Sequence, residues 1–415
     1  MVREHAWFAG VDWASEAHHA CVVDAAGVKK GERTFRHTGA GLAEMADWIV
    51  DQAGLAAEDV AVAIEVPHGP VVESLMERGF PVYAINPKQL DRFRDRFSLA
   101  GAKDDSRDAQ VLADALRTDA HCLRRLDPVD PVVVELREWS RIAEELTRDR
   151  TRLANRIREQ LWRYYPQILQ ATNDVAQPWF LELWERVPTP AKGQRVHHRT
   201  LERLLKRHRI RRIDADGLRG HLRAPSISVA PGTTEAAVAH IRSASERLRL
   251  VQRQLTDARR QIDRLTQTLS ERGDPDSGQP RQRDVVILSS LPGVGRIVLA
   301  TLLAEAYQPL QRRDYQALRC LCGVAPVTRR SGKSKIVVRR LAAHHRLQDA
   351  LYHWARVAVQ RDPLSAAKYA ALRSRGHGHA RALRSVADRL LAVACAMLRN
   401  QTLYDPNHSA RRHAA

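Results

Sequence analysis

The sequence predicts an α/β domain at the N-terminus, then a long helical middle and a mostly α-helical C-terminal domain. Short apolar runs alternate with helical spacings up to about residue 125, and from Pro131 onward apolar residues recur at steps of three and four. A chain of 415 residues is too long for one compact core, so two or three domains are expected. We place these regions at residues 1–127, 128–275 and 285–404, with a basic tail at 405–415.

The N-terminal region is expected to form one mixed sheet. Its elements, in chain order, are strands at 7–12, 19–24 and 32–36, a helix at 41–50, a strand at 60–65, a helix at 70–79 and a strand at 81–86. The run Val60–Glu65 is apolar without interruption until its final acid, which is typical of a strand buried on both faces. Three strands followed by a βαβ pattern indicate one α/β domain.

The helical middle contains two apolar stripes. The first is broken only at Arg150 and consists of Leu136, Trp139, Ala143, Leu146, Leu153 and Ile157. The second keeps alternating steps of three and four and consists of Ile241, Ala244, Leu248, Val251, Leu255, Ala258, Ile262, Leu265 and Leu269. Such spacing predicts a coiled coil or a long antiparallel helix pair, formed within one chain or between chains.

The charge of the chain indicates a polyanionic partner. The sequence has 67 Lys and Arg against 48 Asp and Glu, a formal net charge of +19. Nucleic acid or an anionic membrane surface would suit this charge, but no apolar run approaches the ~20 residues that cross a bilayer. The N-terminus lacks the features of a signal peptide, and five cysteines form no recognisable disulfide framework or zinc site. We therefore expect a cytoplasmic protein with reduced thiols that binds nucleic acid.

Two stretches could contact a phosphate backbone. Residues 192–223 contain eleven Lys or Arg against three acids, and Arg209, Arg211 and Arg212 lie within them. This segment is either a solvated basic surface or one that follows nucleic-acid phosphates. Pro292–Gly295 opens a helix and resembles the turn of helix-hairpin-helix modules, in which backbone amides at Gly293 and Gly295 would hold a phosphate. A packing turn between helices is the alternative.

Acidic residues gather where a sheet usually places its site. Asp12 ends the first predicted strand and Glu65 ends a central one. On a helix beginning near Lys103, Asp105 and Asp108 share a face, and Asp104 with Asp108 would satisfy the geometry equally. Converging carboxylates repel one another without a cation, and Mg²⁺ prefers such oxygen ligands. Two such ions would stabilise the attacking and leaving oxygens in phosphodiester cleavage.

These residues resemble a known family. The order Gly10-Val-Asp12, Glu65, Asn86-Pro87 and Lys103-Asp-Asp-Ser-Arg-Asp108-Ala is similar to that of the DEDD transposases of the insertion-sequence family one-ten. Their N-terminal domain resembles the RuvC Holliday-junction resolvase, which has an RNase H-like fold. The resemblance implies that Asp12, Glu65, Asp105 and Asp108 are the metal ligands. Threonine is usual in the family where this chain has Asp104.

The C-terminal motifs resemble the same family. Pro292-Gly-Val-Gly295, Gly323-Val-Ala-Pro326 and Ser331-Gly332 follow in the family's order, and the resemblance implies that Ser331 is a nucleophile. Its neighbours could hold a phosphate and neutralise developing charge, and they are Arg329, Arg330, Lys333 and Lys335. From the residues alone, a basic loop that contacts the DNA backbone is the simpler interpretation. Ser334 is the alternative position for the nucleophile.

The resemblance implies a transposase that cleaves and rejoins DNA through a transient phosphoserine link with Mg²⁺. It further implies a guide RNA that pairs with donor and target DNA, and a homo-oligomer, dimer or tetramer, that assembles through the helical stretches and builds each active site from two subunits. Two alternatives remain open at this point. One is a metal-dependent junction nuclease without a covalent step, and the other is a non-catalytic nucleic-acid-binding protein.

Overall fold

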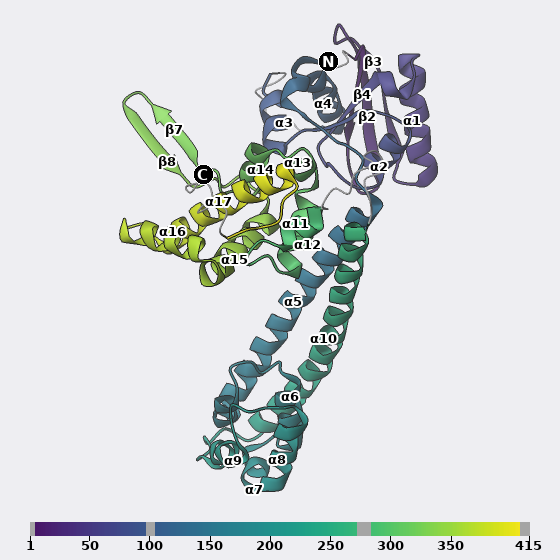
Figure 1. Cartoon of the computed structure of the whole chain (residues 1–415). Helices are drawn as coiled ribbons and strands as arrows, with labels where there is room; N and C mark the ends of the chain where they lie inside the picture. The colour runs from purple at the N-terminus through teal and green to yellow at the C-terminus, as the bar shows by residue number, and fades with distance from the viewer. Residues whose placement is uncertain (1–4, 97–103, 272–283, 407–415) are drawn as a thin grey trace. The chain divides into compact units, whose positions relative to one another are not determined.

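The chain forms two compact units, residues 1–128 and residues 129–415 (Figure 1). The structure is a computed structural model, and it describes residues 5–96, 104–271 and 284–406. Residues 273–280, whose Gly, Pro and Asp content predicts a linker, and most of the expected tail at 405–415 lie outside the described residues. Among the residues described, no helix is both long and apolar enough to cross a membrane.

Unit 1 is built on a six-stranded mixed sheet with strand order β3-β2-β1-β4-β5-β6. The strands are β1 (Trp7–Asp12), β2 (Ala17–Asp24), β3 (Lys29–Arg36), β4 (Val60–Ile64), β5 (Val82–Ala84) and β6 (Arg124–Arg125). The first three are antiparallel neighbours, β4 and β5 run parallel to β1, and β6 closes the far edge antiparallel to β5. The five predicted strands are confirmed, and β6 was not predicted because two exposed arginines give no strand pattern.

Helices cover both faces of this sheet. One face packs against α1 (Gly39–Ala53) and α2 (Pro70–Glu77), and the other packs against α4 (Asp105–Asp119). A short helix, α3 (Pro87–Arg94), follows β5 and begins with a capping box from Asn86 and Gln89, which satisfies its first backbone amides. Alternation along β1 separates the two faces, since Ala9 and Val11 pack on the α1 side and Phe8 on the α4 side.

Unit 2 contains two long helices that lie side by side, α5 (Pro131–Tyr164) and α10 (Thr233–Glu271). They are antiparallel: Leu136 near the start of α5 shares a core with Leu265 near the end of α10, and Ile157 shares one with Ile241. Both predicted stripes are therefore buried against each other within the chain. Of the arrangements left open by the sequence, the structure has the intramolecular antiparallel helix pair.

A small helical head lies at the far end of this pair. It consists of a 3-10 helix, η3 (Pro166–Ala171), and the helices α6 (Pro178–Arg186), α7 (Pro190–Arg195), α8 (His198–Arg207) and α9 (Ala215–Arg223). Its aromatic core includes Tyr164, Tyr165, Phe180 and Trp184, all at most 2% exposed. The basic segment 192–223 therefore belongs to a packed subdomain with a hydrophobic core.

The C-terminal body of unit 2 packs around the other end of the helix pair. Its helices are α11 (Asp284–Ser289), α12 (Arg296–Glu305), α13 (Tyr307–Gln311), α14 (Tyr315–Leu321), α15 (His345–Arg361), α16 (Pro363–Ser374) and α17 (His379–Asn400). A two-stranded hairpin of β7 (Val327–Ser331) and β8 (Ser334–Val338) projects from these helices (Figure 1). The mostly helical composition agrees with the prediction, whereas the hairpin was not predicted.

Candidate active site and nucleic-acid surfaces

Asp12 and Glu65 lie at the carboxyl ends of two neighbouring parallel strands. The last register pair of β1 and β4 is Val11 with Ile64, and Asp12 and Glu65 are the next residues along the two segments. Glu65 follows the last residue of β4, and its charge contributes to raising the pKa of Arg94 at the end of α3 (Pro87–Arg94). Asp12 follows Phe8 and Gly10 on the same face of β1. Alternation along β1 therefore directs Asp12 from the sheet toward α4.

Gly10 lets α4 lie directly on this part of the sheet. A Cβ built on Gly10 would lie 2.0 Å from the carbonyl oxygen of Ala109 and 2.6 Å from the backbone nitrogen of Ala113. Both are backbone atoms, which cannot swing away as a side chain could. This close approach seats the first turns of α4 over β1, where Asp12 ends the strand.

Asp108 on α4 is buried and ion-paired. Only 1% of the residue is exposed. Arg94, the last residue of α3, donates from Nε to Oδ1 at 2.5 Å and from Nη2 to Oδ2 at 2.7 Å. The carboxylate of Asp108 raises the pKa of Arg94, and the charges of Asp91 and Glu65 add to this shift. The positive charge that a buried carboxylate requires is thus supplied by a guanidinium.

The two candidate acids at the start of α4 differ in position. Asp104 is the extended N-cap residue (φ −148°, ψ 134°), and Asp105 is the first residue of the helix. Both are exposed. Asp105 lies four residues before Ala109, which contacts β1, so it is on the sheet-facing side of the helix. Asp104 precedes the helix with an extended backbone, so helical spacing does not set the direction of its side chain.

Polar contacts connect the first turn of α4 with β2 and β3, which lie on the side of β1 opposite β4. Ser106 of α4 donates to Glu32 of β3 at 2.5 Å, and this hydrogen bond lowers the pKa of Glu32. His19, the cross-strand partner of Asp12, lies 3.7 Å from Glu32 and 2.9 Å from the hydroxyl of Thr34. None of these supporting residues was singled out from the sequence, because the contacts join positions far apart along the chain.

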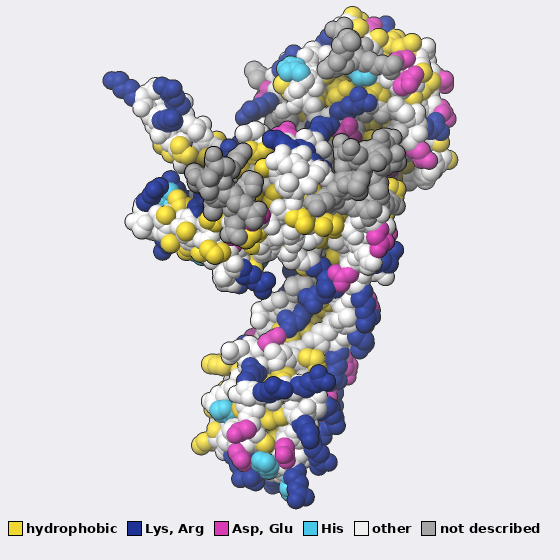
Figure 2. All heavy atoms as spheres, viewed as in Figure 1, with side chains coloured by type: hydrophobic (Ala, Val, Ile, Leu, Met, Phe, Trp, Pro, Cys, Tyr) yellow, Lys and Arg dark blue, Asp and Glu magenta, His cyan; other side chains and the backbone are white. Residues whose placement is uncertain are grey.

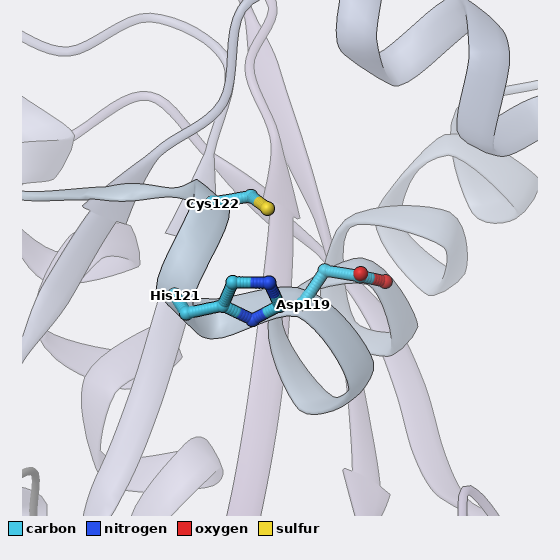
Figure 3. A group of neighbouring side chains, drawn as sticks. All are labelled: Asp119, His121 and Cys122. Carbon is cyan, nitrogen blue, oxygen red and sulfur yellow. The ribbon is translucent and has the colours of Figure 1, made fainter.

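The four acids are not drawn to a single point. Within the described residues, one group of at least three Asp, Glu, His or Cys side chains lies within 4.8 Å, and it is Asp119, His121 and Cys122 at the other end of α4 (Figure 3). Asp119 already pairs with Arg96 and accepts from Thr118. Cys122 is exposed, unlike the buried Cys21, Cys322 and Cys395.

Ser331 ends β7 at the tip of the hairpin. It pairs across the strands with Ser334, and the two-residue turn between them contains Gly332 at φ +53°. Alternation places Ser331, Ser334, Arg329 and Ile336 on one face of the hairpin. Both serines thus point to the same side, as candidates for one role.

The cations around Ser331 are divided between two faces. Arg330 pairs with Lys335 on the face opposite the serine, whereas Arg329 shares the serine's face. Lys333 lies in the turn. Figure 2 shows Lys and Arg side chains along the hairpin and at its tip (Figure 2). The hairpin is exposed on both faces, with Ile336 56% and Val337 57% exposed.

The two glycines of the Pro-Gly-Val-Gly turn have different surroundings, one packed against a helix and the other open. Gly293 (φ +84°) lies against α15, where a Cβ would be 2.8 Å from the backbone nitrogen of Ala358, and Trp354 donates to the carbonyl of Pro292 at 3.0 Å. Packing therefore accounts for Gly293. Gly295 is the N-cap residue of α12, and a Cβ built on it would have no other atom within 4 Å. It opens into a depression of about 660 Å³ whose basic lining consists of Arg259, Arg296, His353 and Arg361.

The three arginines chosen from the basic segment have different environments. Arg209 is exposed in the left-handed conformation (φ 53°), and Arg211 is exposed on the same turn. Arg212 instead lies over the buried ring of Trp179 at 5.4 Å and donates to the carbonyl of Ala171 at 2.9 Å. Lys and Arg side chains gather over this head and along the helix pair (Figure 2). Arg212 is partly structural, so Arg211 is the cleaner probe of binding.

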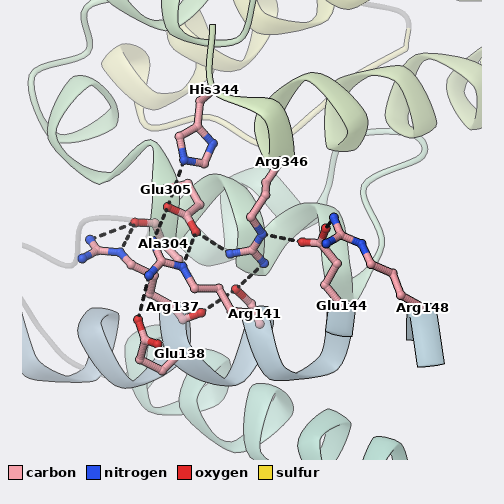
Figure 4. A network of polar contacts seen from close by, with 10 residues as sticks. Arg137, Glu138, Arg141, Glu144, Arg148, Ala304, Glu305, His344 and Arg346 are labelled. Atoms are coloured by element: carbon pink, nitrogen blue, oxygen red, sulfur yellow. Dashed lines mark hydrogen bonds and ion pairs between the residues drawn. The ribbon is translucent and has the colours of Figure 1, made fainter. Parts of the chain in front are cut away.

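A partly buried ion network joins α5 to the C-terminal body (Figure 4). The side chain of Glu305 is 5% exposed, pairs with Arg346, and accepts from Arg141 at 3.2 Å. Arg346 also donates to Glu144 at 2.6 Å and to Ser140 at 2.9 Å. These contacts fix α12 and α15 on α5, and the segment that leads from β8 into α15 ends at this joint.

A mixed sheet with acids at the ends of β1 and β4 and on the packed helix α4 defines the RuvC-like domain of DEDD transposases. A DEDD transposase family model of the IS110 type matches residues 9–166, and a model described as "Transposase IS116/IS110/IS902 family" matches residues 285–370. The chain belongs to the IS110 family of transposases, and its predicted enzyme class, a DNA transposase, is confirmed.

Similar proteins cover the chain to different extents. The "Mini-circle putative transposase for IS117" of Streptomyces coelicolor is 31% identical over 406 residues, 96% of this chain and 95% of that protein. The "Putative transposase y4uE" of Sinorhizobium fredii is 62% identical over 216 residues. That match spans 52% of this chain and 60% of the relative.

Proposed function

We propose that this transposase cleaves and rejoins DNA strands through a covalent link between DNA and Ser331, with Mg²⁺ held by the four acids. The observation that supports the proposal is that Asp12 and Glu65 lie at the carboxyl ends of the neighbouring parallel strands β1 and β4, in the sheet that packs against α4 with its buried Asp108. In this assignment, residues 1–127 contain the acidic site, 285–404 contain the serine, and 128–275 form the helical middle with its basic head.

The residues fit a hard divalent cation. Every proposed ligand is a carboxylate, and Asp105 on the sheet-facing side of α4 supplies an accessible one. The position of Asp105 one turn before Ala109 favours it over Asp104. When bound, Mg²⁺ would stabilise negative charge on the oxygens of the reacting phosphate. The chain's own carboxylates would orient that phosphate relative to the sheet.

Serine chemistry conserves the energy of the broken bond. Ser331 Oγ would form a bond to phosphorus while the bond from phosphorus to the neighbouring sugar oxygen breaks, and the proton leaves with the released hydroxyl. A hydroxyl of another strand then attacks the same phosphorus and releases the serine, so rejoining needs no ATP. Arg329, on the same face as Ser331, is the cation best placed to hold that phosphate.

Guide RNA and subunit assembly complete the proposal. Exposed Arg209 and Arg211 on the helical head are available to an RNA backbone, and Gly295 with its basic depression is available to a DNA or RNA phosphate. The apolar stripe of α10 is buried on α5, so oligomer contacts would use other surfaces. We retain the proposal that each active site combines acids from one chain with the serine of another.

Trapping the protein–DNA adduct tests the covalent step. The wild-type protein should give a denaturation-resistant adduct that maps to Ser331, and Ser331→Ala should lose it while still binding DNA. Ser334→Ala is the matched control because it removes the cross-strand hydroxyl on the same face. An adduct that survives Ser331→Ala and disappears in Ser334→Ala would move the nucleophile. DNA cleavage without any adduct would favour a metal-dependent nuclease.

Mixing variants tests the shared site. Asp105→Asn and Ser331→Ala proteins should each be inactive, and should regain partial strand exchange when they form mixed oligomers. If mixed oligomers form but stay inactive, the acids and serine act within one chain. Separately, a specific DNA pair recombined by protein freed of RNA with nuclease would exclude the guide RNA.

A further inference from the structure

We propose that Arg94 and the divalent cation compete for the carboxylate of Asp108, so that metal binding requires Arg94 to release this carboxylate. The inference rests on the proposed metal site. It adds a residue that belongs to no acid motif, lies fourteen positions before its partner and comes from a different helix. Arg94 is thus a positioning residue that sets how readily the acidic site accepts its ion.

The contact satisfies both oxygens of Asp108. Nε and Nη2 of Arg94 each donate to a different oxygen, at 2.5 and 2.7 Å, so the planar guanidinium matches the carboxylate in the two-bond geometry typical of strong pairs. The side chains are 1% exposed for Asp108 and 19% for Arg94. Water therefore screens this attraction poorly, and an incoming cation must replace it.

The positions of the other acids agree with this competition. Asp12 projects toward the α4 side of the sheet, Asp108 lies on α4, and the charge of Glu65 acts on Arg94, yet the ligand oxygens of these three acids do not all lie within 4.8 Å of one another. Arg94 takes both oxygens of one of the three. A divalent ion bound by these three acids would bring their oxygens closer together. Its two positive charges would compensate more of their negative charge than a single guanidinium does.

Arg94 has a second anchor that could hold it after release. Its Nη1 pairs with Asp91 on the same helix, three residues earlier, and Asp91 is exposed. A released guanidinium would therefore stay beside the acids, on a residue outside the proposed metal set. Arg92 lies on the same helix and is exposed, which makes it a matched control for the loss of one positive charge.

The test measures metal binding directly, with Mn²⁺ as the probe and free Mn²⁺ followed by electron paramagnetic resonance. Arg94→Gln should bind Mn²⁺ about tenfold more tightly than the wild-type protein, which corresponds to about 1.4 kcal/mol. Arg92→Gln should change the affinity less than twofold. Without metal, Arg94→Gln should melt at a lower temperature because Asp108 loses its partner, and Mn²⁺ should restore more of its stability than it adds to wild type.

The outcomes separate this inference from the proposed metal site. If Asp108→Asn abolishes Mn²⁺ binding while Arg94→Gln binds with unchanged or weaker affinity, the metal site stands and the competition is wrong. If neither the wild-type protein nor Arg94→Gln binds Mn²⁺, both are wrong. Arg94→Lys keeps the charge but loses the two-bond geometry, and its affinity should fall between wild type and Arg94→Gln.

Discussion

The two candidate reacting regions are built in opposite ways. Asp108 is 1% exposed, and both of its carboxylate oxygens accept hydrogen bonds from Arg94. Its helix, α4, lies so close to β1 that no side chain fits at Gly10. Ser331 ends a two-stranded hairpin whose residues are nearly all exposed. An isolated hairpin of this kind is marginally stable in water. Asp108 is thus held by packing and by an ion pair, whereas Ser331 lies on a strand pair that few contacts support.

The largest effect on stability is expected for Gly10→Ala, which tests whether packing holds α4 on the sheet. The added Cβ would overlap the Ala109 carbonyl, so α4 must move off the sheet or the domain must unfold. We expect a loss at or above about 3 kcal/mol, the upper part of the usual range for overpacking. Urea unfolding measures it, with Gly39→Ala as the control because a Cβ there meets nothing within 4 Å. A loss below about 1 kcal/mol would mean that α4 is not held as described.

Glu305→Gln tests how strongly the ion network holds α12 and α15 on α5. Removing one partner of a buried charge network should cost about 3 kcal/mol, measured by denaturant unfolding. The control Glu138→Gln removes a carboxylate that is 58% exposed and should change stability by less than about 0.5 kcal/mol. Equal effects of the two variants would contradict a structural role for the joint.

The same variant predicts a pH dependence. Burial alone would raise the pKa of Glu305, but Arg141 and Arg346 hold it below its ordinary value of 4.5. Because the folded-state pKa is lowered, the contribution of Glu305 is present above pH 4.5 and is lost as the pH falls through the folded-state value. The difference in stability between wild type and Glu305→Gln should therefore shrink only below about pH 4.5. A difference that shrinks already between pH 7 and 5 would assign the effect to another group.

Arg211→Gln is expected to have a modest effect, on binding alone. Loss of one phosphate contact should lower RNA affinity and reduce the slope of log affinity against log salt by about one, without changing the melting temperature. Arg212→Gln should also destabilise the head, since it removes the contacts with Trp179 and Ala171. An unchanged salt slope in Arg211→Gln would exclude this turn from the RNA surface.

The smallest effect on stability is expected at the hairpin. Ile336→Thr replaces a side chain that is 56% exposed on the serine's face, so the free energy of unfolding should stay within about 0.5 kcal/mol of wild type. DNA-adduct formation should still fall if this face meets DNA. A large loss of stability would show that the hairpin is packed in solution, and would contradict the difference described between buried Asp108 and the exposed hairpin.

The sequence was informative where burial imposes a pattern. The five main strands of unit 1 were predicted because continuous or alternating apolar runs record which faces are covered, and Asp12 and Glu65 were found because they end such runs. The hairpin was missed because exposed strands leave little apolar signal. Arg94 was missed because its contact with Asp108 joins two helices, and no local spacing encodes it.

The helix pair illustrates a different limit. Its apolar stripes were visible, but a stripe is the same whether its partner is another chain or the same one. Only the antiparallel match of Leu136 with Leu265 and of Ile157 with Ile241 assigns the partner. The choice between Asp104 and Asp105 was likewise open from spacing, and it depends on which face of α4 meets Gly10.

The antiparallel pair α5 and α10 also makes the head a replaceable module. Because one helix leaves the C-terminal body and the other returns to it, residues 165–232 begin and end side by side. Their replacement by a short helix-to-helix loop would leave both connections to the body unchanged. Removal of matched turns from both helices would shorten the distance to the head without altering the body's own contacts. This layout would allow the head to be exchanged while the rest of unit 2 keeps its sequence.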